Sequence, residues 1–432
     1  MEQNPLLLRR WLLRNTIEAL EDIATILSSR IEVSAFADQF LIGYECLTQA
    51  SPEARRKILE DPRTGIWIES VESGLLACGD LLPDEPDLTA WAIEISLLSL
   101  SIALIDGVPY RVLLPRLRGG KISLPGVRMF FCSAEQPEPT LLSLTTDGTL
   151  HVNGERVTLN PVPESGGFQL SASEPLLNHP SGSGIFPLQD SDIAYESWGS
   201  LLDNASKLIA LHPPSQELSR CFGSVIVPVQ GESENTHCSV SFSNRPCILY
   251  MSWAPLPEII AEAIVHESDH QSFYVHTRRV VLWNEPVEKQ PCIYRSPWRD
   301  DPRPLDGILR GASAFIQVGE FAGALLVPLN RGTRVFDWAG QRAVLTLRQS
   351  LDAISVIRRH GPLSQAGRDI LESLYDRARR ALAGITQEPD FEKWRNTAAE
   401  KELEHDTAWQ KRHQTNEKDQ ISLRQCPQPS VA

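Results

Sequence analysis

Apolar residues recur at helical spacing from the start of the chain to about residue 115. Leu12, Ile17 and Leu20 show the spacing, and a longer apolar run extends over residues 91–105. Apolar side chains three and four residues apart lie on one face of an α-helix. The pattern therefore predicts a helical domain over residues 1–118.

Between residues 119 and 195 the pattern changes to short alternating segments separated by turn residues. Asp147-Gly148 and Asn153-Gly154 are strong hairpin signals, because both central residues of a type I′ turn need a positive φ. Pro, Ser and Gly then crowd residues 161–184, which is typical of a surface loop. We expect a β-rich subdomain that ends in a loop.

Residues 196–390 alternate short apolar strands with longer helical segments. A helix is expected to begin at Pro257, because proline is tolerated in a first helical turn, and to run past His270. Strands are expected over 224–227, 238–242 and 247–252, and further helices over 305–327, 343–359 and 364–382. These elements predict a mixed α/β domain of zincin-like layout.

The last segment, residues 391–432, is polar and has almost no apolar spacing, so we expect it to be disordered, with a frayed helix as the alternative. The whole chain is thus predicted to be α+β. A helical N-terminal domain comes first, a small β subdomain follows, and a zincin-like mixed α/β catalytic region then precedes the tail.

Charge and cysteine usage narrow the functional classes. The 432 residues include 55 acidic and 41 basic side chains, a formal charge of −14, which argues against a nucleic-acid or anionic-membrane partner. None of the eight cysteines forms a C-x-x-C pair, and scattered cysteines suit a reducing compartment. The N-terminal apolar run is too short for a signal peptide, and no apolar stretch reaches the ~18 residues that span a bilayer. We expect a cytoplasmic protein with no membrane and no nucleic-acid partner.

The segment from His266 to His270 reads His-Glu-Ser-Asp-His, an H-E-x-x-H motif. Residues four apart share one helical face, so His266 and His270 can present two imidazole nitrogens to one divalent ion. Glu267 projects beside them, close enough to touch a metal-bound water. The motif predicts a metal site held by the two histidines, with Glu267 as a catalytic residue.

The third ligand is open from the sequence. His276 has the spacing of a longer histidine motif, but Phe273 stands where glycine must break the helix, so a solvent-facing His276 is favoured. Glu288 has a suitable distance along the chain, although Asn284-Glu285-Pro286 makes that stretch a loop. Glu320 lies on the next predicted helix and is our candidate ligand, against the alternative of a solvated helix glutamate.

Downstream stands the sequence Tyr-Arg-Ser-Pro-Trp-Arg-Asp-Asp-Pro-Arg-Pro-Leu-Asp-Gly-Ile-Leu-Arg-Gly, residues 294–311. Together with the H-E-x-x-H helix it resembles a bacterial family of HExxH-motif peptide modification proteins from ribosomal peptide natural-product pathways. The resemblance covers roughly residues 220 to 330. It implies an Fe(II)- and 2-oxoglutarate-dependent dioxygenase that hydroxylates the β-carbon of residues in a precursor peptide.

The resemblance assigns roles position by position. His266 and His270 match the family's metal histidines, Glu267 its glutamate, and Arg299 and Arg303 two arginines of its second motif. We expect Arg299 and Arg303, with Arg295 as a further candidate, to bind the 2-oxoglutarate carboxylate, because arginine suits bidentate carboxylate recognition. The alternative is that these loop arginines pair with nearby aspartates.

The chain departs from the family where many members have a histidine, at Arg310 or at Phe315. Two other functions therefore stay open. One is a zinc metallopeptidase of gluzincin type, with Zn²⁺ as its metal, Glu267 as general base and Glu288 or Glu320 as third ligand. The other is a non-catalytic relative that binds a peptide.

Overall fold

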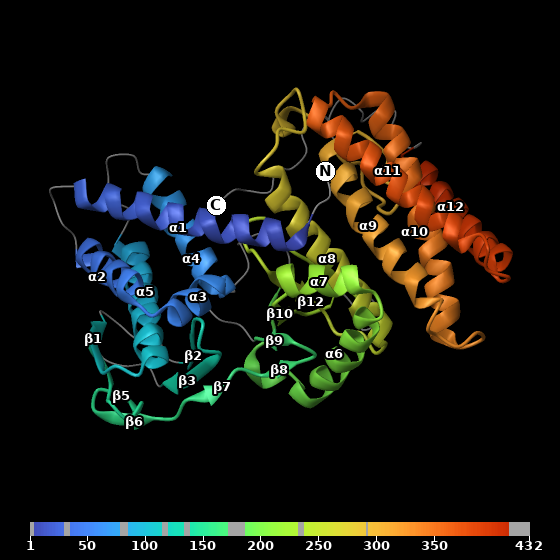
Figure 1. Ribbon diagram of the computed structural model, residues 1–432. Helices are drawn as coiled ribbons and strands as arrows, with labels where there is room; N and C mark the ends of the chain where they lie inside the picture. Colours follow the sequence, from blue (N-terminus) through green and yellow to red (C-terminus); the bar gives the residue numbers. More distant parts are fainter. Residues whose placement is uncertain are drawn as a thin grey trace.

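The computed structural model describes residues 4–29, 35–77, 85–114, 120–133, 139–171, 186–231, 237–290 and 293–413. The predicted α+β class is confirmed. Helices make up both ends of the described chain, and three small sheets lie between them (Figure 1).

The N-terminal helices bury an apolar core of their own, to which Phe40 and Trp67 contribute stacked rings 5.7 Å apart. These helices are α1 (Pro5–Ser29), α2 (Ala35–Gln49), α3 (Pro52–Glu60), α4 (Pro62–Ala77) and α5 (Glu85–Asp106). One described helix contains a window, Thr89–Asp106, that is long and apolar enough to cross a membrane, and 61% of that window is buried inside the protein. The burial is that of a core helix, with other helices on one side and the β subdomain on the other.

The β subdomain consists of two antiparallel sheets, with strand orders β1-β4-β5-β6 and β2-β3-β7. Its strands are β1 (Tyr110–Leu114), β2 (Gly120–Leu124), β3 (Met129–Ser133), β4 (Thr140–Leu144), β5 (Leu150–Val152), β6 (Glu155–Val157) and β7 (Asn160–Pro161). Asn153 and Gly154 connect β5 to β6 with φ of 50° and 85°, which confirms the predicted hairpin. β1 lies inside the segment that we expected to be helical.

A third sheet of five strands supports the C-terminal half, in the order β11-β12-β10-β9-β8. Its strands are β8 (Glu164–Ser165), β9 (Phe168–Leu170), β10 (Val225–Pro228), β11 (Ser239–Val240) and β12 (Ile248–Met251). β10 and β12 are parallel and buried at every residue, which explains their unbroken apolar sequences. β8 and β9 come from the predicted β subdomain and loop, so the sheet crosses the expected boundary at residue 195.

Seven helices are described after residue 194. They are α6 (Tyr195–Ala210), α7 (Pro213–Phe222), α8 (Pro257–Thr277), α9 (Leu305–Leu325), α10 (Arg334–His360), α11 (Gln365–Ile385) and α12 (Phe391–His413). α8 begins with Pro257, as expected. It is the central helix, with α6 and α7 on one side and α9 on the other (Figure 1). The edge strand β11 also contacts it. α9 in turn packs along α10.

The expectation of a disordered tail over residues 391–432 is wrong for Phe391–His413, which forms α12. Trp394 is fully buried over Gly340 of α10, where an added Cβ would lie 2.2 Å from the indole ring. Arg348 of α10 and Glu402 of α12 form an ion pair of 2.7 Å. The helix therefore docks on α10 through one tryptophan and ion pairs. Such a contact leaves almost no apolar periodicity in the sequence. Residues 414–432 lie outside the described residues.

Candidate metal centre

His266 and His270 lie one turn apart on α8, as the motif predicts. Their ring centroids are 4.6 Å apart and the rings are nearly perpendicular, at 89°. Imidazole nitrogens that share one ion at about 2.1 Å place their ring centroids roughly 4.5–5.5 Å apart. The observed spacing fits two neighbouring ligands of one metal ion.

Both imidazoles are neutral and lack hydrogen-bond partners among the described residues. The Nδ1 atoms of His266 and His270 are buried without a partner. Burial lowers the pKa of His266 well below its ordinary value, and the charges of His270 and Arg342 lower it further. Burial, with a smaller effect of Arg310, lowers the pKa of His270 to about 3. A neutral ring keeps the nitrogen lone pair that a metal needs.

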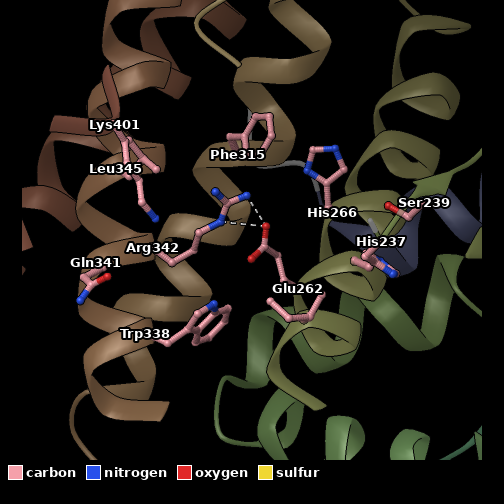
Figure 2. A pocket seen from close by; sticks show the side chains of 12 residues that line it. His237, Ser239, Glu262, His266, Phe315, Trp338, Gln341, Arg342, Leu345 and Lys401 are labelled. Carbon is pink, nitrogen blue, oxygen red and sulfur yellow. Dashed lines mark hydrogen bonds and ion pairs between the residues drawn. The ribbon is translucent and has the colours of Figure 1, made fainter. Parts of the chain in front are cut away.

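His266 faces a cavity of about 520 Å³ (Figure 2). The cavity is enclosed by α8, α9, α10, α12 and the chain leading into β11. Its lining residues are His237, Ser239, Ile259, Glu262, Ala263, His266, Phe315, Trp338, Gln341, Arg342, Leu345 and Lys401. Glu262 lies one turn before His266 on the same helical face and accepts a 2.8 Å hydrogen bond from Nε of Arg342. His266, one of the two candidate metal ligands, thus stands at the wall of a space large enough for a small ligand.

Glu267 is turned toward the sheet edge instead of the cavity. Its two carboxylate oxygens accept 2.8 Å hydrogen bonds from the hydroxyls of Ser239 and Ser241, and the residue is 3% exposed. Burial raises the pKa of Glu267 to about 7, against the opposing effect of the two serines. In this arrangement the carboxylate ties α8 to the β11 segment.

An aromatic ring lies beside the histidine pair where a further ligand could stand. The ring centroid of Phe315, from α9, is 4.6 Å from that of His266, and the Trp298 ring packs 4.9 Å from Phe315. Arg310, one turn earlier on α9, forms a 2.7 Å ion pair with Asp306 and lies over the Tyr274 ring. A hydrocarbon ring and a paired cation thus fill the two positions at one or the other of which we expected many members of the resembled family to have histidine.

The structure does not bring Glu320 to the histidines. Both of its carboxylate oxygens are bound by Arg377, at 3.1 and 2.6 Å. Across the part of the chain that the structure describes, no three His, Cys, Asp or Glu side chains gather to hold a metal ion. The Glu288 side chain lies outside the described residues. His276, expected to face solvent, is 6% exposed, so that expectation is wrong.

Arg299 and Arg303, expected to bind 2-oxoglutarate, both pair with Asp301, at 2.9 and 2.7 Å. Neither lines the cavity beside His266. This placement corresponds to the alternative in which the loop arginines pair with neighbouring aspartates. The loop is anchored instead by Trp298, which packs against Gly311 so closely that an added Cβ would lie 2.3 Å from the ring.

Sequence reasoning missed three charged residues of the cavity. Glu262 precedes His266 by four residues, and that spacing was a readable signal. Arg342 stands one residue before the start that we expected for its helix, and Lys401 falls in the expected disordered tail. No local pattern connects these two cations to the metal motif.

Comparison with models of known protein families finds no match, and no curated protein matches the chain either.

Proposed function

We propose that the protein is an Fe(II)- and 2-oxoglutarate-dependent hydroxylase that acts on the β-carbon of residues in a ribosomally made precursor peptide. The supporting observation is a pair of neutral, unpartnered imidazoles, His266 and His270, of which His266 lines a cavity that also contains arginine and lysine. Non-haem iron oxygenases use few protein ligands and leave positions open for the cosubstrate and O₂.

The placement of Glu267 favours oxidation over hydrolysis. A hydrolytic general base must come within hydrogen-bond reach of the attacking water. The two oxygens of Glu267 accept hydrogen bonds from Ser239 and Ser241, and the residue does not line the cavity. A zinc peptidase would need this carboxylate to reach a water in the cavity.

His266 and His270 would hold the iron, which when bound would activate O₂ for the oxidation of an unactivated C–H bond while 2-oxoglutarate is oxidised to succinate and CO₂. Glu267 positions α8 by its bonds to the β11 segment. In this proposal the antiparallel edge strand β11, with Ser239 at the cavity, receives an extended substrate. A peptide could add to this edge through main-chain hydrogen bonds and place one residue near His266.

A non-catalytic peptide-binding relative is the second candidate. The contact of Phe315 with His266 favours it, because this ring offers no lone pair where a third ligand would stand. Two imidazoles alone bind a divalent ion weakly. In this alternative the cavity and the strand edge would bind a peptide without changing it.

The decisive experiment is co-expression with the precursor peptides encoded nearby, followed by mass spectrometry of each peptide. Hydroxylation adds the mass of one oxygen, and His266→Ala should abolish the gain. In purified protein, Fe(II) bound under anaerobic conditions should support O₂-dependent release of succinate from 2-oxoglutarate. Peptide cleavage that persists without O₂ would support the peptidase, and a folded protein that takes up no metal would support the non-catalytic relative.

A further inference from the structure

Two cationic side chains face His266 across the cavity. Arg342 projects from α10 and Lys401 from α12, on the side opposite the metal helix (Figure 2). Glu262 is the one carboxylate among the described residues that line this cavity. Two cations against one carboxylate give the described lining a net positive charge.

The two cations have unused hydrogen-bond donors. Arg342 directs Nε and Nη2 at a single oxygen of Glu262, and its Nη1 makes no hydrogen bond with any described residue. Lys401 Nζ likewise forms no ion pair with the residues that the structure places. The side chain of Arg342 is 27% exposed, and Trp338 and Leu345 provide an apolar surround. Unused cationic donors in such a setting favour an anion, because each donor gains a charge-assisted bond.

Arg342 lies within reach of the metal pair. Its guanidinium is 5.5 Å from the Phe315 ring centroid, and the His266 ring is 4.6 Å from the same centroid. A short molecule with an acid group at each end can therefore have one end beside His266 and the other at Arg342. Arg299 and Arg303 cannot serve in this way where they stand, because they line no part of this cavity.

We propose that Arg342 and Lys401 form the subsite for the far carboxylate of a small dicarboxylate that enters beside His266. Glu262 occupies Arg342 until the ligand arrives, and the ligand carboxylate then takes its place. The identity of the ligand as 2-oxoglutarate rests on the proposed function, whereas the anion subsite rests on the cavity alone.

The test measures binding of glutarate, which has both acid groups and no keto group, to the full-length metal-free protein by titration calorimetry. Arg342→Gln is expected to weaken binding about ten- to a hundredfold, because a charge-assisted bond is lost. Lys401→Gln should weaken it a few-fold, since this side chain is exposed. Glu262→Gln should tighten binding, because the internal competitor loses its charge.

The matched control is Arg348→Gln. Arg348 lies on the same helix and pairs with Glu402 of α12, but it does not line the cavity. This variant removes an arginine and an α10–α12 ion pair, and it should leave glutarate affinity unchanged. Circular dichroism and the unfolding midpoint of each variant establish that the fold is intact.

The inference is overturned if wild-type protein binds no glutarate at millimolar concentration, or if folded Arg342→Gln binds it as tightly as wild type. It is also overturned if Arg299→Gln, and not Arg342→Gln, loses binding. The proposed function can fail separately. Arg342-dependent glutarate binding in a protein that takes up no Fe(II) would retain the subsite and refute the hydroxylase. Peptide hydroxylation with an unchanged KM for 2-oxoglutarate in Arg342→Gln would retain the hydroxylase and refute the subsite.

Discussion

Phe315→His is expected to convert the histidine pair into a three-ligand metal site. The substituted ring starts 4.6 Å from the His266 centroid, the same spacing that separates His266 from His270. The Arg342 guanidinium, 5.5 Å from the ring at position 315, disfavours the protonated form of the new histidine and keeps it available as a ligand. The side chain is half-buried and partly open to the cavity, so the polar ring carries a modest desolvation cost.

The size of the effect follows from the number of ligands. Zn²⁺ binding to four-ligand structural sites releases about 10–16 kcal/mol of free energy, so each ligand contributes roughly 3 kcal/mol. A third ligand is therefore expected to raise Zn²⁺ affinity on the order of a hundredfold. Zn²⁺ affinity is measured by competition with a chromophoric chelator, and Co²⁺ spectra report the number of ligands. Phe315→Leu is the control, because it removes the ring without adding a ligand.

Two results would refute this reasoning. One is a folded Phe315→His protein that binds Zn²⁺ no more tightly than Phe315→Leu. The other is a gain that survives His266→Ala in the same chain, since that would place the new ligand on some other group. Arg310→His serves as a second comparison. It should gain less, because Arg310 lies over Tyr274 and pairs with Asp306.

Three further predictions concern stability. Glu267→Gln should stabilise the metal-free protein at pH 8 by about 3 kcal/mol and should have no effect below pH 4.5. The reason is that folding raises the pKa of Glu267 from 4.5 to about 7, so the free energy of unfolding of the wild type falls as pH rises between these values. Urea unfolding that shows an equal difference at both pH values would contradict this prediction. Trp394→Ala should lower the free energy of unfolding, measured in urea, by about 3–5 kcal/mol, because the indole is fully buried over Gly340. The variant should also be cut faster by proteases near residue 390. An unchanged urea midpoint would mean that α12 adds no stability. Gly311→Ala should lower the free energy of unfolding by about 1–3 kcal/mol, because the added Cβ would lie 2.3 Å from the Trp298 ring. An unaltered Tm would show that the Trp298 ring moves freely.

The helices of the C-terminal half were predictable where an apolar face and a helix start signal coincide. Pro257 marks the start of α8, and α9 and α11 begin within a residue of the expected positions. α7 was not among the expected helices, although Pro213 and Pro214 stand in its first turn, where proline is tolerated. α12 was missed because only Trp394 and Ala398 of its residues are buried.

The candidate site was predictable only as far as it is local. His266, Glu267 and His270 belong to one helix, so their spacing alone places them together. The contact of Phe315 with His266 depends on how α9 packs on α8, and the position of Arg342 depends on how α10 packs in turn. Periodicity does not encode these packing relations. The arginines that the second motif emphasised, Arg299 and Arg303, stay on their own loop with Asp301.

The first helix has a consequence for how the chain acquires its structure during synthesis. Arg9 donates a 2.8 Å hydrogen bond to Sγ of Cys247, a residue 238 positions later, and Leu8 and Leu12 pack against Phe222. The apolar face that begins α1 thus has no native partner until more than half of the protein has left the ribosome. Contacts of such long sequence separation form late and slowly. A nascent chain with this face exposed is a substrate for chaperones, and a C-terminal half produced without α1 would leave Phe222 partly uncovered and prone to aggregate.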